Sequence, residues 1–220
     1  SDWSSDVCSS DLSANLKSTT MTSSAPAEQH SGRPLHWGWI LCVVIISILP
    51  RLPFLHLPFE RDEGAYAYTG QIIADGGLPY RDAFDHKPPL IHYIFAGSFW
   101  LFGETVAAPR IMTVVFIAIA SYVLLMLLLR LTNSRFLAIT LTILFGLSLG
   151  SPVYSGVNVN TEVLTLPCIF IGIYLCILPN GRIQNLFFAA LAFGLGFMIK
   201  QPVITIAAGM LLWSGLRYRR

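Results

Sequence analysis

The 220-residue sequence contains few charged residues, and this scarcity limits what the protein can be. Only 12% of its residues are charged, while 54% are hydrophobic; an ordinary soluble domain carries roughly 25% charged residues. The formal net charge is only +2 and the basic residues form no stripe, which argues against nucleic-acid binding. These values indicate a polytopic membrane protein whose partners are membrane lipids and lipid-linked molecules.

Motifs for nucleotides and for structural zinc are also missing. The sequence has no Walker loop and no dinucleotide fingerprint, so a cytosolic nucleotide-sugar site is not indicated. Its four cysteines lack the paired spacing of a zinc site, and three of them lie in apolar runs as small packing residues. No cofactor is therefore assigned from the sequence, and a divalent metal is left open.

The N-terminal segment differs in composition from the rest. Residues 1–33 are rich in Ser, Thr, Asp and Ala and have little to bury, so we expect disorder there and no cleavable signal peptide. The opening SDWSSDVCSSDL resembles translated sequencing-adapter read-through, and we assign it no function. The functional domain is predicted to occupy residues 34–220. Because the chain ends just after an apolar run, we expect a domain truncated at its C-terminus.

Long apolar runs predict an all-α fold, a polytopic membrane helix bundle. The run over residues 35–54 has tryptophans at one end and prolines at the other, as a membrane span often does. The 19-residue run over 111–129 is long enough to cross a bilayer. Further spans are predicted at residues 136–150, 163–178, 185–199 and 202–216, which gives about six crossings.

The run over residues 88–103 is ambiguous, because it is only about 16 residues long and contains His92, whereas a crossing helix needs about 20. If it does not cross, every short connector that carries arginine falls on the same side, as the positive-inside rule requires. These connectors contain Arg33, Arg130 with Arg135, Arg182, and Arg217 with Arg219 and Arg220. We therefore expect juxtamembrane helices in the first external loop. Residues 60–90, residues 151–162 and Lys200 then share the outer face.

The stretch over residues 60–90, ERDEGAYAYTGQIIADGGLPYRDAFDHKPPL, carries charges that no apolar environment explains. Asp62 and Glu63 precede a segment that has the pattern of a short amphipathic helix ended by Gly76 and Gly77. Such an acid at a membrane surface is a candidate general base. The alternative is that Asp62 caps the helix and Glu63 adds favourable charge at its N-terminus.

Other polar residues stand at the ends of apolar runs. Lys87 directly precedes two prolines that hold the backbone extended, which makes it a candidate phosphate ligand. His86 is open as a ligand, as an acid or base, or as a plain interfacial residue. Lys200 needs a partner, a wet cavity or a snorkelling position near the helix end. Glu162 begins a span, where a helix N-terminus stabilises an acid, and Arg110 fits an interfacial anchor.

Taken together, the segments DEGAYAY, YRD, HKPPL, LFG, APR and MIKQP resemble the N-terminal half of GT-C glycosyltransferases. The likeness is greatest to the bacterial branch related to protein O-mannosyltransferases and to the aminoarabinose and galacturonic-acid transferases of lipopolysaccharide, and it extends over roughly residues 35–216. It implies that a sugar passes from a polyprenyl-phosphate donor to a hydroxyl of a lipid, glycan or protein acceptor, with inversion. The implied location is the periplasmic face of a bacterial inner membrane.

The resemblance also implies roles for individual residues. Asp62 corresponds to the catalytic base of the family, and Lys87 and Lys200 correspond to lysines that would hold the donor phosphate. The predicted catalytic residues are Asp62, Glu63 and Glu162, and the predicted substrate-binding residues are Lys87, Lys200, His86, Arg81 and Tyr66. His86 stands where the aminoarabinose transferases have an acidic residue associated with a metal, so the metal site is left unassigned.

Two other classes of protein fit part of the pattern. A transporter or flippase would also need charges at the outer face, but transporters tend to carry ionisable groups near the midplane on broken helices related by internal repeats. The sequence shows neither a convincing repeat nor a charge in the middle of a span. A noncatalytic membrane assembly subunit is the third interpretation, favoured if the 220 residues are the complete chain.

Overall fold

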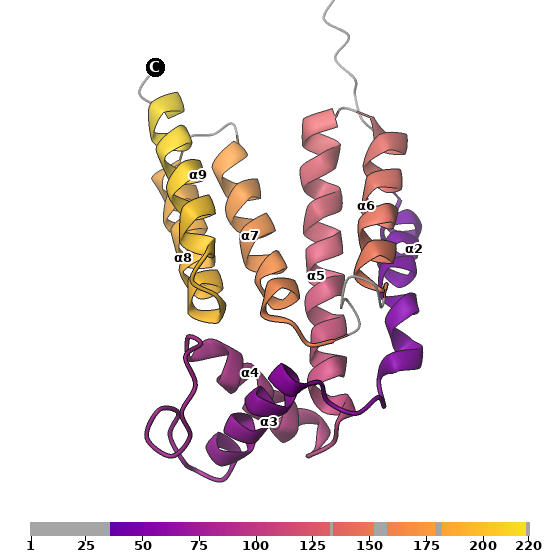
Figure 1. The fold of residues 1–220 in the computed structure, drawn as a ribbon. Coiled ribbons are helices and arrows are strands. Elements are labelled where there is room, and N and C mark those ends of the chain that lie inside the picture. Colours follow the sequence, from indigo (N-terminus) through magenta and orange to yellow (C-terminus); the bar gives the residue numbers. More distant parts are fainter. Residues whose placement is uncertain (1–35, 133, 152–157, 179–181, 219–220) are drawn as a thin grey trace, which may run out of the picture. The chain divides into compact units, whose positions relative to one another are not determined.

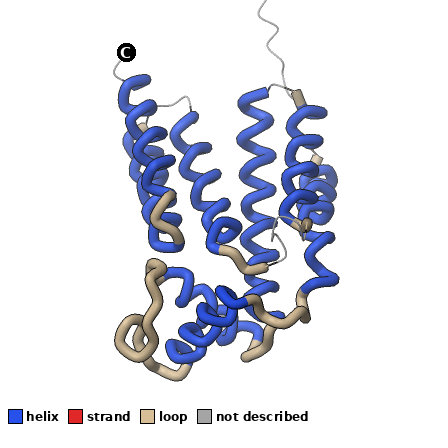
Figure 2. Tube along the Cα trace, in the orientation of Figure 1, coloured by secondary structure: helices blue, strands red, loops and turns tan. Residues whose placement is uncertain are grey.

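The computed structural model of the chain describes residues 36–132, 134–151, 158–178 and 182–218. The N-terminal segment predicted to be disordered lies outside the described residues. Within these ranges the fold is all-helical and contains no strand (Figure 2), so the predicted all-α class is confirmed. The helices are α2 (Trp37–Ile48), the 3-10 helix η1 (Leu49–Phe54), α3 (Arg61–Ala74), α4 (Leu90–Phe102), α5 (Ala107–Thr132), α6 (Arg135–Leu149), α7 (Thr161–Ile177), α8 (Ile183–Ile199) and α9 (Val203–Tyr218).

The first apolar run folds as α2 and continues without a break into η1. Pro50 and Pro53 explain the tighter winding of η1, because proline lacks an N–H and clashes with the preceding turn of an α-helix. The combined stretch Trp37–Phe54 has 18 residues and α5 has 26. Among the described helices, these two are long and apolar enough to cross a membrane.

Helices α6, α7, α8 and α9 are apolar but shorter, with 15 to 17 residues each. They run side by side with α2 and α5 (Figure 1), and each begins and ends within a few residues of a predicted span. Local signals fix their ends: Ser134 accepts a hydrogen bond from the Leu137 N–H at the start of α6, at 3.3 Å. The architecture is that of a helical membrane protein, and the count of about six crossings stays a prediction.

Helices α3 and α4 pack on each other at one end of the upright helices (Figure 1). Gly70 permits this contact, because a Cβ atom on it would lie 2.7 Å from the Phe95 Cβ. Helix α3 ends at Ala74, and the turn that follows contains Gly76, whose φ of 91° is readily adopted by glycine. This arrangement agrees with the juxtamembrane helices predicted for the first external loop.

One buried cluster joins this end to the upright helices. Its members come from α3, α4, α5, α7 and α8 and from the connection before α7: Tyr66, Ala67, Ile91, Phe95, Phe99, Ala108, Val159, Leu164 and Ile199. A second cluster, Cys176, Ala189, Phe193 and Val203, holds α7, α8 and α9 together. Burial of apolar surface therefore fixes α3 and α4 against the bundle, with the polar segments exposed beside them.

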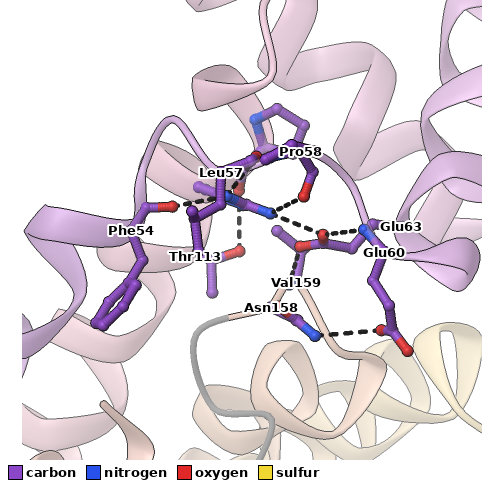
Figure 3. Close-up of polar contacts among 10 residues, drawn as sticks. Phe54, Leu57, Pro58, Glu60, Glu63, Thr113, Asn158 and Val159 are labelled. Carbon is purple, nitrogen blue, oxygen red and sulfur yellow. Dashed lines mark hydrogen bonds and ion pairs between the residues drawn. The ribbon is translucent and has the colours of Figure 1, made fainter. Parts of the chain in front are cut away.

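A buried arginine holds the connection between η1 and α3 (Figure 3). The guanidinium of Arg110, near the start of α5, donates from Nη1 to the carbonyl oxygens of Phe54 (2.6 Å) and Leu57 (2.7 Å), and from Nη2 to that of Pro58 (3.1 Å). Arg110 Nη2 also lies 2.9 Å from Oε2 of Glu63. The prediction of an interfacial anchor for Arg110 is wrong, since the residue is 2% exposed.

The Glu63 carboxylate is the counter-ion of this buried arginine. Its Oε2 also accepts from the Glu60 N–H at 3.0 Å, and its Oε1 accepts from the Val159 N–H at 2.5 Å (Figure 3). We call Arg110 and Glu63, with the groups they bind, the Arg110 clamp. The clamp joins α5, the start of α3 and the chain before α7, which are distant in the sequence.

The orientation of the two ends can be tested by cysteine labelling. In a variant without the native cysteines, Arg81→Cys lies in the external loop and Arg182→Cys lies between α7 and α8 at the other end. We expect a membrane-impermeant maleimide to label position 81 in intact cells, and position 182 only after the membrane is permeabilised. Labelling of position 182 from outside would contradict the orientation.

The clamp predicts a large loss of stability for Arg110→Met. The substitution leaves the Glu63 carboxylate buried without its counter-ion, which costs about 3–5 kcal/mol. The measurement is thermal unfolding of the purified protein in one detergent. The control is Arg130→Met on the same helix; Arg130 is exposed and donates to the Tyr174 hydroxyl at 3.0 Å, so its loss should cost no more than about 1 kcal/mol.

A second variant separates the charge effect from a general packing defect. Adding Glu63→Gln to Arg110→Met removes the unpaired charge, so the double variant should be less destabilised than the sum of the two single variants. Strict additivity would show that the two side chains do not act as a pair.

Candidate active site

Asp62 and Glu63 have different surroundings although they are neighbours. Both oxygens of Glu63 are occupied in the clamp and its side chain is fully buried, so it has a structural position. The Asp62 side chain is 51% exposed, and its Oδ1 lies 3.4 Å from Nε of the exposed Arg61. The alternative interpretation, that Asp62 caps the helix, is wrong, because the N-cap residue of α3 is Glu60. Asp62 therefore has a carboxylate that a substrate can reach.

Glu162 and Lys200 meet at the same end of the bundle. Glu162 lies in the first turn of α7, and Lys200 is the C-cap residue of α8, just before the turn that leads into α9. Lys200 Nζ and Glu162 Oε1 form an ion pair, and the Thr161 hydroxyl donates to Glu162 Oε2 at 3.1 Å. Lys200 thus has the partner that its position in an apolar run requires.

Tyr66 connects these groups electrostatically. Burial raises the pKa of the Tyr66 phenol, and the negative charges of Asp62, Asp85 and Glu162 raise the same pKa further. These carboxylates come from α3, from the loop after α3 and from α7. Tyr66 also packs edge-on against His92, whose Nε2 lies 3.6 Å from Asp85 Oδ2, and it shares a buried cluster with Leu164 of α7, so the fold brings the three segments together. At neutral pH the Tyr66 hydroxyl keeps its proton and is a hydrogen-bond donor.

The backbone of Lys87 is held on both sides. Its N–H donates to Asp85 Oδ1 at 3.3 Å, and its carbonyl oxygen accepts from the Tyr80 hydroxyl at 2.5 Å. Tyr80 itself has a φ of 67°, which a non-glycine residue seldom adopts. Within the described ranges the Lys87 ammonium has no hydrogen bond or ion pair. The loop fixes the lysine backbone and leaves its charge available.

Asp85 lies between two histidines. Its Oδ1 is 3.1 Å from Nδ1 of the exposed His86, and its Oδ2 is 3.6 Å from Nε2 of His92 on α4. Burial lowers the pKa of His92, and the Asp85 charge opposes that shift. The His92 ring packs edge-on against Tyr66 and Tyr80, at centroid distances of 6.0 and 6.3 Å. His92 thus links the Lys87 loop to Tyr66.

Arg81 is engaged elsewhere. Its Nε and Nη2 donate to the Asp82 carboxylate at 2.9 and 2.7 Å. The hydrogen bond from Arg81, followed by that from the Leu78 N–H, lowers the pKa of Asp82 to about 2. Among the described residues no group of three or more His, Cys, Asp or Glu side chains is placed to hold a metal ion.

Of the eight residues predicted for the site, the structure pairs Glu162 with Lys200 and places His86 and Lys87 around Asp85. Tyr66, which follows Asp62 by one turn of α3, packs in one buried cluster with Leu164 and Ile199, which lie close to that ion pair in the sequence. Sequence reasoning gave Asp85 and His92 no role. A histidine within an apolar helix was the available signal, because a buried imidazole needs a polar neighbour.

Comparisons with known proteins bear on the chemistry. The search of curated proteins found no match, and the search of solved structures found none. The family described as dolichyl-phosphate-mannose-protein mannosyltransferase matches residues 86–219, which is more than half of the chain. The match includes Lys87, Glu162 and Lys200 and begins after Asp62. The chain therefore belongs to the dolichyl-phosphate-mannose-protein mannosyltransferase family, which consists of membrane glycosyltransferases of the GT-C type.

Proposed function

We propose that this glycosyltransferase moves a sugar from a polyprenyl-phosphate carrier to an acceptor hydroxyl at the outer face of a bacterial inner membrane. The observation that carries the proposal is that Tyr66 of α3, Leu164 of α7 and Ile199 of α8 pack in one buried cluster, beside the Glu162–Lys200 ion pair. It brings an accessible carboxylate to the end of the bundle where Lys200 and Lys87 also lie. A base and two cations are the groups that transfer from a phosphate-linked donor requires.

Asp62 is the base in this proposal. Its carboxylate takes the proton of the acceptor hydroxyl, and the acceptor oxygen attacks the anomeric carbon of the sugar from the side opposite the phosphate. The bond between that carbon and the phosphate oxygen breaks, and its electron pair leaves with the lipid phosphate. The sugar is transferred with inversion, and the proton remains on Asp62 until solvent removes it.

Lys87 and Lys200 stabilise the charge that develops on the departing phosphate. The Lys87 backbone is already fixed by Asp85 and Tyr80, so little further ordering is needed for its ammonium to act. Lys200 is paired with Glu162 before the donor binds, and a phosphate group would compete with that carboxylate for the ammonium. Glu162 in this scheme keeps Lys200 directed toward the site.

The orientation follows from the arginines at the opposite end. Arg130 and Arg182 lie in the connectors that the positive-inside rule assigns to the cytoplasm. The active site then faces the periplasm, and the polyprenyl tail of the donor lies among the apolar helices. Exposed apolar side chains on α6 and α8, such as Phe136 and Phe187, are consistent with contact to lipid. The acceptor is a lipid, a glycan or a protein that presents a hydroxyl at this face.

The role of Asp62 predicts that Asp62→Asn lowers kcat for sugar transfer by about 10²–10⁴-fold, because the amide cannot take the proton. The measurement uses the full-length enzyme, a polyprenyl-phosphate sugar donor and a membrane fraction that supplies the acceptor. Asp75→Asn is the matched control: Asp75 is exposed at the other end of α3 and should leave transfer unchanged. Normal transfer by Asp62→Asn would eliminate Asp62 as the base.

The two lysines predict a defect in donor binding. Lys87→Ala and Lys200→Ala each remove one charge-assisted hydrogen bond to phosphate, worth about 1.5–3 kcal/mol, or roughly 10–100-fold in donor Kd. Donor binding is measured directly in detergent, with Arg182→Ala at the opposite end as the control. If donor affinity is unchanged in both lysine variants, neither lysine binds the phosphate.

A further inference from the structure

A groove of about 250 Å³ lies on the side of α3 that faces away from Asp62. On α3 the groove is lined by Gly64, Ala67, Tyr68 and Gln71, whose spacing places them on one face of the helix. Gln71 follows Asp62 by nine positions, or two and a half turns, which places the two residues on opposite sides of the helix. The remaining walls are Phe59, Phe99, Glu104, Thr105 and Val106.

Two aromatic rings on the apolar side of the groove are held in place. The Phe59 ring lies under the guanidinium of Arg110, 6.0 Å from its centroid, and is therefore positioned by the clamp. Phe99 is 5% exposed and packs edge-on against Phe95, with centroids 6.5 Å apart. Because both rings belong to packed regions of the fold, this surface exists before any ligand arrives.

Gly64 borders open space in the groove. A Cβ atom at this position would meet no atom within 4 Å, so the missing side chain is space and not a close contact. Glycine inside a helix costs roughly 0.5–1 kcal/mol relative to alanine, and neither a tight turn nor a helix crossing at Gly64 requires it.

The rim of the groove carries polar groups that are not engaged by the protein. Tyr68, Gln71, Glu104 and Thr105 are exposed, and in the part of the chain that the structure describes their side chains make no hydrogen bond or ion pair. They offer two hydroxyls, one amide and one carboxylate. No lysine or arginine lines the groove. A phosphate would meet the charge of Glu104 with nothing to neutralise it, and an acyl chain would cover four polar groups.

We propose that this groove binds a neutral sugar unit of hexose size. The C–H face of a pyranose ring would lie against the exposed Tyr68 ring and the half-buried Phe59 ring, above the buried Phe99. Neighbouring hydroxyls would pair with the Glu104 carboxylate and the Gln71 amide. The volume is below that of pockets for drug-sized ligands, roughly 300–1,000 Å³, and suits one ring.

The groove also points to an acceptor class, and this part rests on the proposed function. The body of α3, about 10 Å across with its side chains, separates the groove from Asp62. The sugar held in the groove is therefore not the one that reacts. An acceptor that uses both places carries at least two sugar units, which selects a glycan from the three acceptor classes.

The experiment is saturation-transfer NMR on the full chain in nanodiscs, with methyl α-mannoside, methyl α-glucoside and methyl β-galactoside as probes. We expect saturation transfer from the protein to at least one probe, with the same affinity in Gly64→Ala. Gly64→Trp fills the groove and should abolish the signal. Glu104→Gln changes an exposed side chain without altering the fold and should weaken binding about tenfold. Circular dichroism establishes that Gly64→Trp retains its helix content.

Three outcomes would overturn the proposal: no transfer to any probe, equal transfer in wild type and Gly64→Trp, or displacement of the probe by tetramethylammonium, which would identify a site for cations. The result is separate from the reaction. If the proposed transfer is wrong but the groove is right, probe binding persists while Asp62→Asn has no effect on activity. If the groove is wrong, probe binding fails while that variant still loses transfer.

Discussion

The organisation of the end of the bundle that carries α3 and α4 depends on one buried guanidinium. Arg110 donates to three carbonyl oxygens that follow η1 and to the Glu63 carboxylate, and it does so at 2% exposure. A charged side chain in such surroundings is tolerated only when it is paired and hydrogen-bonded. The fold must therefore place a carboxylate next to Arg110. The planar fork of arginine reaches several acceptors at once, which a lysine ammonium on a flexible stem does less well.

This constraint determines what Asp62 can do. Consecutive residues on an α-helix point about 100° apart, because 3.6 residues complete a turn. Once Glu63 is fixed toward Arg110 and the Val159 N–H, Asp62 is turned out of the buried interface. Glu63 is therefore a buried counter-ion, whereas Asp62 is an accessible carboxylate. The accessibility of Asp62 depends on the fixed position of Glu63.

The sequence predicted the helices well, because apolar runs and their breakers are local features: the run at 185–199 became Ile183–Ile199, and prolines marked the change from α2 to η1. Long-range pairing was harder. Arg110 binds groups that precede it by 47 to 56 residues in the sequence. The hydropathy pattern shows only that a charged residue lies beside an apolar run, and it does not identify these distant partners. The start of α3 was also hard to place, because three acidic residues, Glu60, Asp62 and Glu63, lie close together there and Glu60 is the N-cap residue. Asp85 and His92 interact across a loop, so neither had a partner visible in the sequence.

The two lysines illustrate how a site at a membrane surface can be selective before its ligand arrives. An unpaired ammonium close to apolar helices is costly, and the Glu162 carboxylate offsets that cost for Lys200. A neutral ligand gains nothing by breaking this pair, whereas an anionic phosphate replaces the carboxylate and preserves the neutralisation. Lys87, held by its backbone and with no carboxylate on its ammonium among the described residues, is available for the first contact. In the proposed function, one paired and one available cation together favour a phosphate-bearing lipid over the neutral lipids that surround the site.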